Sequence, residues 1–447
     1  MDIIIGMFVT FSILLLSINK GIFVGIPLLI GLGIFTLISW RRGFSLKDIC
    51  NMSYNGGKKA FVVLKIFILI GAITAIWMAA GTVPAIVYYG IKLMNPSYFI
   101  LYAFLISSLV SVLLGTSLGT VSTVGLALIV MAKGGNVDLN LATGAIIAGA
   151  YFGDRCSPMS SSANLVANLT DTDIFTNIRN MVSSSVIPFI LSIILYTAFS
   201  FTQPLSFVES SIDREILNSF HVDWFVLLPA ILIVAFSVFK VNVKSSMLCS
   251  ILVAVLLSVF IQHQSMKETI NYLFFGFYLH PDNPLYSIIK GGGIISMWKA
   301  ALVVYVSCAL AGIFDGTNML NSVEKVLARA RTRAELFAYT IVVSMLTAAF
   351  GCNQSMATVL TNQLVTSTYQ AKHIDKYTLA LDLENTGILL AALIPWNIAA
   401  FVPTTTMDVS PIGFIPYAFY LYLLPLVCLM RLRSSGINRC NQAVLKE

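Results

Sequence analysis

The chain has few charged residues. Only 11% of its 447 residues are Asp, Glu, Lys or Arg, whereas 57% are hydrophobic and the mean hydropathy is +0.87. A water-soluble protein carries about a quarter of its residues as charged side chains. This shortage excludes a soluble enzyme, a disordered chain and a secreted disulfide scaffold, and it leaves a membrane protein that crosses the bilayer many times.

Signatures of metal and nucleotide chemistry are also missing. The seven cysteines form no CxxC pair, the four histidines are dispersed, and no Walker A or HExxH motif occurs. We therefore expect a transporter and not an enzyme, with no cofactor and no nucleic-acid partner, driven by a gradient of Na+ or H+. The net charge of +7 is expected to reside in short loops that orient helices in the bilayer.

Long apolar runs follow one another along the chain. They predict an all-α polytopic membrane fold with about 11–13 transmembrane segments, some of them broken or re-entrant because Gly and Pro interrupt the runs. The lipid bilayer is the expected partner, and the sequence leaves open whether the chain acts alone or as a homodimer.

Charged loops predict the orientation. Lys and Arg are in excess in residues 41–59, 325–333 and 431–447, which marks these segments as cytoplasmic. The acidic residues 209–223 are expected outside. Because the first basic loop follows two crossings, both the N-terminus and the C-terminus are predicted to be cytoplasmic.

Weak matches suggest two related halves. The matched pairs are Gly81-Thr82 with Gly316-Thr317, Gly115 with Gly351, and Pro158 with Pro395, at offsets of 316 − 81 = 235, 351 − 115 = 236 and 395 − 158 = 237. The loop charges give the halves opposite orientations, which is the inverted repeat of secondary transporters. The predicted organisation is an N-terminal two-helix segment (1–60), a first repeat (61–203), a linker with two spans (204–297), a second repeat (298–430) and a basic tail (431–447).

The densest polar stretch among the apolar runs is GAYFGDRCSPMSSSAN, residues 149–164. A charged side chain at the bilayer centre costs at least about 2.5–3.5 kcal/mol, which makes it a candidate functional group. Pro158 breaks the helix, and freed carbonyls are tolerated only where they line a cavity or are buried. Asp154 is a candidate cation ligand, proton carrier or counter-ion of Arg155. The other candidates are Ser157, Ser160, Ser161 and Asn164, and the alternative is a plain surface loop.

A second polar break is LDLENTGILLAALIPWN, residues 381–397. Asp382 and Glu384 are two residues apart, so on a helix they point to different faces. We predict Glu384 as the functional acid and Asp382 as part of a solvated helix end. Asn385 and Thr386, followed by Gly387, are predicted to form a helix end with their polar groups turned inward.

Two further breaks carry hydroxyl and amide groups, GTSLGTVST (115–123) and NQSMAT (353–358). They are either helix-packing contacts or ends of broken helices that point at a substrate. Their matching positions in the two halves favour the second interpretation. The candidate ligands are Ser117, Thr120, Asn353 and Gln354.

Four segments resemble the NhaC-type Na+/H+ antiporter family, which belongs to the ion transporter superfamily and includes malate/lactate exchangers. They are GTVPAIVYYG (81–90), GTSLGTVSTVG (115–125), GAIIAGAYFGDRCSPMSSSAN (144–164) and LENTGILLAALIPWN (383–397). The resemblance covers most of the chain and implies a bacterial inner-membrane secondary transporter with inverted repeats. It implies an ion and substrate site that includes Asp154, Ser157, Asn164, Glu384 and Asn397, with Asp154, Asn164 and Glu384 as Na+ ligands.

Two acids of the family pattern are neutral in this chain. The family commonly reads SPLSDTTN and LEDSG, whereas this chain has Ser161 and Asn385 at the acidic positions. Each missing carboxylate removes a charge that holds Na+ or carries a proton. Na+/H+ antiport by alternating access is the first prediction, and H+- or Na+-coupled transport or exchange of a small organic solute, an amino acid or a carboxylate, is the alternative.

Overall fold

The computed structural model describes residues 2–20, 22–58, 60–205, 212–239, 241–286, 288–317, 327, 329–351 and 353–434. Within these ranges every regular element is helical, and β-pairing is limited to one bridge between Phe277 and Gly291. The all-α prediction is confirmed. Lys325 of the basic segment, residues 206–211 of the acidic loop and the tail beyond Ser434 lie outside the described residues.

Most of the helices follow one another with short connections, and a longer one joins α15 to η4. Up to residue 202 they are α1 (Asp2–Asn19), α2 (Gly25–Arg41), α3 (Leu46–Lys58), α4 (Phe61–Ala79), α5 (Thr82–Leu93), η1 (Pro96–Tyr98), α6 (Phe99–Leu114), α7 (Ser117–Thr120), η2 (Val121–Gly125), α8 (Leu126–Gly134), α9 (Leu139–Cys156), α10 (Ser161–Thr170) and α11 (Ile174–Thr202). From residue 212 they are α12 (Ile212–Ser219), η3 (Trp224–Leu227), α13 (Leu228–Val238), α14 (Val243–Phe260), α15 (Met266–Phe275), η4 (Ile295–Met297), α16 (Trp298–Gly316), α18 (Arg333–Gly351), α19 (Gln354–Ala371), α20 (Lys376–Leu383), η5 (Glu384–Ile388), η6 (Ala391–Leu393), α21 (Ile398–Met407), η7 (Ile415–Tyr417) and α22 (Phe419–Ser434).

Six helices of the described residues are long and apolar enough to cross a membrane, and nine spans result if each of three bent helix pairs counts as one. The bends lie between α4 and α5 (66°), between α12 and the helix that begins at Trp224 (96°), and between the helix ending at Leu393 and α21 (47°). Broken helices are therefore confirmed. The sequence predicts more segments because apolar runs such as 140–152 end at a break inside the fold.

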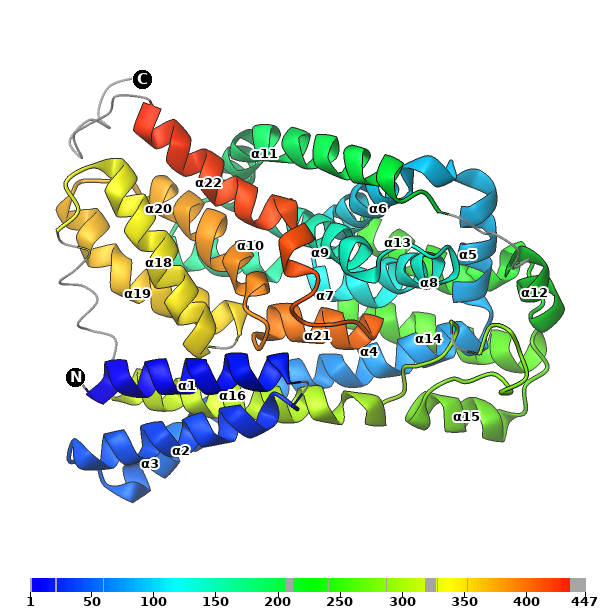
Figure 1. The fold of residues 1–447 in the computed structure, drawn as a ribbon, viewed down its shortest axis with the longest axis horizontal. Helices are drawn as coiled ribbons and strands as arrows, with labels where there is room; N and C mark the ends of the chain where they lie inside the picture. The colour runs from blue at the N-terminus through cyan, green and yellow to red at the C-terminus, as the bar shows by residue number, and fades with distance from the viewer. Residues whose placement is uncertain are drawn as a thin grey trace.

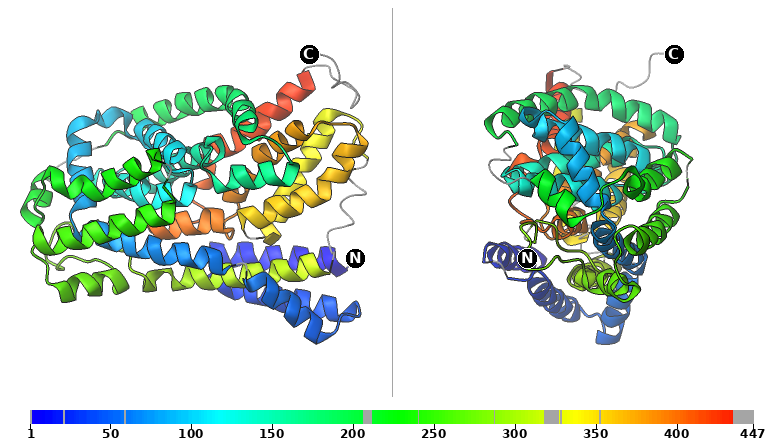
Figure 2. Two further views of the ribbon diagram at one scale, coloured as in Figure 1. Left: turned by 180° about the vertical axis from the view of Figure 1, so that it is seen from behind. Right: turned by 90° about the vertical axis from the view of Figure 1, so that its right-hand side faces the viewer.

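Long helices flank a centre made of short ones. In Figure 1, α1, α2 and α16 lie along one edge of the molecule, and α11 and α22 lie along the opposite edge. Between them, α7, α10 and α21 lie near the middle, while α18, α19 and α20 form one end. Figure 2 shows that the start of α1 and the end of α22 lie at that same end.

Each central break has a local cause. α6 ends at Gly115, whose φ is +64°, and a Cβ at that position would lie 2.6 Å from a backbone carbon of Met159. Only glycine combines that conformation with so close an approach. α9 ends at Cys156 because Ser157 precedes a proline and is extended, with φ −101° and ψ 133°.

The helices that follow the breaks begin with side-chain caps. Thr116 caps α7, Ser160 caps α10, Asn353 caps α19 and Asn397 caps α21, each by accepting a hydrogen bond from a backbone N–H of the first turn. Such caps satisfy donors that otherwise have no partner. The polar residues of the sequence breaks therefore start helices at the centre of the molecule.

The element boundaries recur at one offset. α4 begins at residue 61 and α16 at residue 298, and 298 − 61 = 237. The segment from α7 to α8 spans 117–134, and α19 spans 354–371. In the same way α10 spans 161–170, and α21 spans 398–407. The start and the end of each pair therefore differ by the same number of residues, 354 − 117 = 237. The helix-ending residues Asp171 and Asp408 both have positive φ, 51° and 56°. Of the three pairs matched in the sequence, Pro158 with Pro395 has this offset, whereas the pairs of Gly81 and Gly115, at 235 and 236, are out of register with the helix boundaries.

Candidate functional site

Five helix beginnings line a cavity of about 650 Å³ at the centre of the molecule, which we call the central cavity. α7, α10, α14, α19 and α21 each reach it with their first residues. The polar lining residues are Thr116, Ser117, Tyr151, Asp154, Ser161, Asn242, Lys244, Asn353, Gln354 and Ser355. Helix N-termini carry a partial positive charge and unpaired N–H donors, so this arrangement favours a ligand with anionic or electron-rich oxygens.

Asp154 is the one carboxylate among the lining residues of the central cavity. It sits in the last turn of α9 and is 4% exposed. One carboxylate oxygen accepts a hydrogen bond from Ser117 Oγ (3.2 Å) and the other from Ser160 Oγ (2.9 Å), and Ser160 Oγ lies 2.7 Å from Ser162 Oγ. A carboxylate among hydroxyls offers hard oxygen ligands for a small cation, or a position for one proton.

Five of the residues predicted from sequence come together in this lining: Asp154, Ser161, Ser117, Asn353 and Gln354. They belong to the two halves of the chain, and Gln354 Nε2 donates to the carbonyl oxygen of Ile388 at 3.3 Å. Residues of the breaks at 115–123 and 353–358 thus line the same cavity as Asp154.

Four other predicted residues hold the breaks together and do not line the central cavity: Ser157, Asn164, Thr120 and Asn397. Asn164 Nδ2 donates to the carbonyl oxygens of Pro158 (3.1 Å) and Ser160 (2.7 Å). Thr120 Oγ1 donates to the carbonyl oxygen of Thr116 (2.8 Å), and Asn397 Nδ2 donates to that of Ala348 (2.7 Å). Ser157 Oγ accepts a hydrogen bond from the Met159 amide (3.2 Å). The carbonyl oxygens of Thr116 and Ser160 also accept the backbone amides of Thr120 and Asn164, so these side chains reinforce the first turns of α7 and α10.

Arg155 follows Asp154 in sequence but extends to other helices. It is fully buried and donates to Ser184 (2.8 Å) and Ser185 of α11, to Tyr420 of α22 (3.2 Å) and to Asn385 of η5. The guanidinium therefore joins α9 to three other elements through neutral acceptors. A buried cation held in this way needs a negative charge nearby.

Glu384 is a buried carboxyl group close to Arg155. It is 1% exposed, and among the described residues neither of its carboxylate oxygens has a hydrogen-bond partner. Its charge interacts with those of Arg155 and Asp154, and the three residues form what we call the buried charge group. Glu384 does not line the central cavity, so the three predicted Na+ ligands Asp154, Asn164 and Glu384 do not meet there.

The polar run after Glu384 is not a helix end, contrary to the prediction. Residues 384–388 form a π-helical turn, and the helix continues to Leu393. Thr386 Oγ1 donates to the carbonyl oxygen of Asp382 at 2.7 Å and accepts from Ser344 Oγ at 2.9 Å. Single π-turns inside helices are frequent at functional sites, because they turn the side chains that follow.

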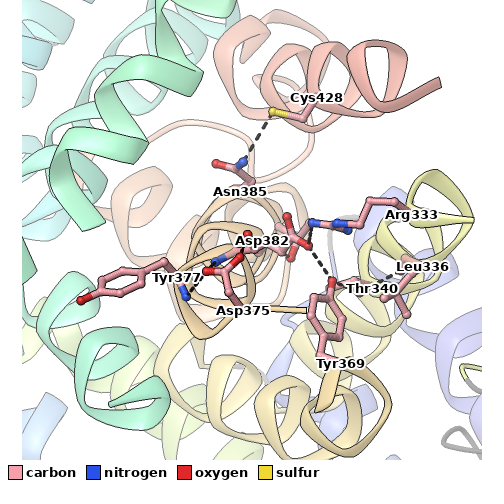
Figure 3. A network of polar contacts seen from close by, with 11 residues as sticks. Arg333, Leu336, Thr340, Tyr369, Asp375, Tyr377, Asp382, Asn385 and Cys428 are labelled. Carbon is pink, nitrogen blue, oxygen red and sulfur yellow. Dashed lines mark hydrogen bonds and ion pairs between the residues drawn. The ribbon is translucent and has the colours of Figure 1, made fainter. Parts of the chain in front are cut away.

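Asp382 is not at a solvated helix end either. It is 4% exposed, forms an ion pair with Arg333 and accepts a hydrogen bond from the Tyr369 hydroxyl at 2.6 Å (Figure 3). Tyr369 also bonds Thr340 at 3.0 Å. Arg333, which the sequence assigns to a charged loop, begins α18 and is buried against this carboxylate. A partner 49 residues away leaves no local signal in the sequence.

Sequence reasoning missed several lining residues. Thr116 and Ser355 adjoin predicted ligands, while Asn242 and Lys244 lie in the short connection between two apolar runs, where a polar cap and a lysine mark the start of a helix. Residues 115–119 also have the GxSxG spacing of a hydrolase nucleophile. Ser117 donates to Asp154, however, and no histidine lines the central cavity, so the geometry is not that of a catalytic triad.

Comparisons with known proteins show that the chain is similar in sequence to several antiporters. The chain is 28% identical over 429 residues to the malate-2H+/Na+-lactate antiporter of Bacillus subtilis, covering 93% of this chain and 90% of that protein. It is 27% identical over 412 residues to the Na+/H+ antiporter NhaC of the same organism, covering 91% of each. The arginine/ornithine antiporter ArcD of Halobacterium salinarum is 24% identical over 415 residues, with 90% and 84% covered. The model of the Na+/H+ antiporter family matches residues 149–433, and this chain belongs to that family.

Proposed function

We propose that the protein is a secondary antiporter in which Asp154 exchanges H+ or Na+ while the central cavity carries a small organic anion. The observation that carries this proposal is the single carboxylate in a cavity of about 650 Å³ at which five helix N-termini meet. A bare Na+ does not need such a volume, which is in the range of organic-ligand sites. Lys244 in the lining adds a positive charge for an anion.

Charge balance supports the coupling to one cation. The buried charge group holds one cation, Arg155, and two carboxylates, Asp154 and Glu384. An uncompensated buried charge costs several kcal/mol, so one H+ or one Na+ is needed to bring the group to neutrality. The site is thus built to take up and release a single positive charge, and Asp154, which reaches the central cavity, is the group to which that charge binds.

We further propose that residues 61–203 and 298–430 are repeats of inverted topology, with 1–60 and 204–297 outside them. The constant offset of 237 in element boundaries supports the repeat, since 398 − 161 = 237 as well. The basic segments and the shared end of α1 and α22 in Figure 2 support cytoplasmic termini in a bacterial inner membrane. Inverted repeats allow a central site to open alternately to each side.

Transport in proteoliposomes tests the role of Asp154. With imposed Na+ and H+ gradients, Asp154→Asn is expected to reduce coupled flux to background and Glu384→Gln to reduce it strongly. Asp48→Asn, at an exposed position of α3, is the matched control and keeps wild-type flux. Unchanged flux in both Asp154→Asn and Glu384→Gln contradicts the proposal.

The cargo is tested in the same vesicles with radiolabelled three- and four-carbon carboxylates and amino acids. We expect a carboxylate or an amino acid to move against its gradient when a Na+ or H+ gradient is imposed. Na+-driven H+ movement with no flux of any organic solute supports the alternative, Na+/H+ antiport.

The variant Asn385→Asp tests the charge balance. It adds a third carboxylate to the buried charge group, which is expected to add one cation to each transport cycle. The number of cations in each cycle is measured from reversal potentials.

A further inference from the structure

A second cavity of about 350 Å³ lies where α8 and α21 end, and we call it the distal cavity. The segment from α7 to α8 begins at the central cavity with Ser117, and its last turns, including Lys133, line the distal cavity. α21 likewise begins at the central cavity, and Thr405 to Asp408 line the distal one. At 1.5 Å per residue, the 18 residues of the first segment extend about 27 Å.

The wall of the distal cavity is fixed by close backbone packing. Its outer side is the segment from Phe277 to Met297, and the Gly293 amide donates to the carbonyl oxygen of Gly71 in α4 at 2.7 Å. Gly292 has a φ of +73°, and a Cβ there would lie 2.4 Å from the Ala75 amide nitrogen. The segment is therefore held against α4, so the cavity is a built feature of the fold.

Charge in the distal cavity is positive. Two lysines, Lys133 and Lys290, line it together with one carboxylate, Asp408. Lys133 Nζ lies 3.7 Å from Asp408, whose side chain is 83% exposed, whereas the side chain of Lys133 is only 19% exposed. The two lysine charges also interact with each other, and an anion placed between them relieves their repulsion.

The two threonine hydroxyls of α21 are not free to donate to a ligand, and the two lysines are its charged donors. Thr405 Oγ1 donates to the carbonyl oxygen of Phe401 (2.7 Å), and Thr406 Oγ1 donates to that of Val402 (2.8 Å). Both hydroxyl protons are therefore engaged within α21. The two ammonium groups match a carboxylate, which accepts hydrogen bonds at both oxygens.

We propose that the distal cavity is a carboxylate-binding subsite that receives the organic anion on its path to or from the central cavity. This inference rests on the proposed function, because it requires an anionic cargo. Lys290, the more exposed of the two lysines, provides the first contact, and Lys133 holds the anion at the ends of the helices that lead to the central cavity. Positive charge at the mouth of a path raises the local concentration of an anionic solute.

Lysine labelling of the full-length protein tests the subsite without a transport assay. The protein is placed in nanodiscs of phosphatidylcholine and treated with an amine-reactive reagent, and modification is mapped by mass spectrometry. Succinate is expected to slow labelling of Lys133 and Lys290 at least threefold, whereas uncharged succinamide does not and exposed Lys47 is unaffected. Equal protection by succinate and succinamide overturns the subsite. Protection without succinate in phosphatidylglycerol nanodiscs assigns the cavity to a lipid phosphate and also overturns it.

A variant separates this inference from the proposed function. Lys290→Gln is expected to raise the half-saturating concentration of the transported anion severalfold, to leave the maximal rate unchanged and to weaken the protection of Lys133 by succinate. Lys47→Gln is the control. Absence of organic-anion flux in the wild type refutes the proposed cargo, while the labelling result still reports on the cavity. Flux with an unchanged half-saturating concentration in Lys290→Gln overturns the subsite alone.

Discussion

Two helix pairs that lie 237 residues apart in the chain are held together in different ways. In the first half, α6 packs against α9, and Ala145, Gly149 and Gly153 recur every four residues along α9. A Cβ on Gly149 would lie 2.4 Å from the carbonyl oxygen of Phe104, and one on Gly153 would lie 2.3 Å from the amide nitrogen of Val112. The two backbones therefore touch directly, as small residues allow in membrane helices.

In the second half, α18 packs against α20 and η5 through polar side chains. At the offset of 237, the positions of Ala145 and Gly149 are those of Asp382 and Thr386, since 382 − 145 = 237. Asp382 pairs with Arg333, and Thr386 accepts from Ser344 (Figure 3 shows the first pair). The positions of Arg333, Thr340 and Tyr369 are those of Pro96, Ala103 and Ala132 in the first half, which offer no such side-chain groups. The packing of α6 against α9 thus depends on residues of small volume, whereas the packing of α18 against α20 and η5 depends on paired polar and charged side chains.

Removing the charge pair is expected to have the largest effect. Asp382→Leu leaves Arg333 buried and unpaired, which costs about 3–5 kcal/mol of stability. Thermal unfolding of the purified protein in detergent measures the loss. The double variant Arg333→Met/Asp382→Leu is expected to recover most of it, because an apolar pair carries no unpaired charge. A double variant no more stable than Asp382→Leu would show that the pair is not the cause.

Adding volume to the first half is expected to cost somewhat less. Gly149→Val places atoms against the backbone of α6 and should destabilise the protein by about 1–3 kcal/mol. The matched change in the second half, Thr386→Val, adds no volume and removes one hydroxyl, at about 1 kcal/mol. Both values follow from the same unfolding experiment. Equal losses in the two variants would contradict the difference between the halves.

The sequence anticipates features with a local cause and misses those that depend on distant partners. Gly115 and Pro158 predict helix breaks because each restricts the backbone directly, and a carboxylate beside such a break, Asp154, does reach a cavity. The burial of Asp382 depends on Arg333, 49 residues away, so nothing near it in sequence distinguishes it from a solvated acid. The proposed repeat has a weak sequence signal for a related reason, because positions 237 residues apart carry small or apolar residues in one segment and polar partners in the other.

Helix caps that occur in both halves are expected to respond in the same way to the same substitution. Asp138 caps α9 and Asp375 caps α20, each accepting from backbone amides two and three residues ahead, and 375 − 138 = 237. Replacing either with Ala is expected to cost about 1 kcal/mol, a typical value for a lost cap. Hydrogen exchange of the first turn of each helix measures the local effect. Loss of protection in only one of the two helices would mean that the shared cap does not have a shared role.

The smallest expected effect concerns a cap that titrates in one half only. Asp173 begins α11 and accepts from the backbone amide and hydroxyl of Thr176, both at 2.8 Å, while the matched residue, Ser410, accepts from the amides of Ile412 and Gly413 at 3.3 Å. Those bonds to Asp173 lower its pKa below the ordinary value of a carboxyl group. Its stabilising effect is therefore complete above the ordinary pKa of about 4 and is lost as the pH falls through the lower folded value.

Acidification should accordingly loosen the first turn of α11 and leave the turn after Ser410 unchanged. Hydrogen exchange at the Thr176 and Gly413 amides, each corrected for its intrinsic pH dependence, measures the difference within one molecule. Asp173→Asn keeps an acceptor oxygen but cannot titrate, so the selective loosening is expected to disappear in that variant. Parallel loosening of both turns, or selective loosening that persists in Asp173→Asn, would refute the assignment to this carboxylate. The comparison of the halves would then rest on their packing and not on their charges at the helix ends.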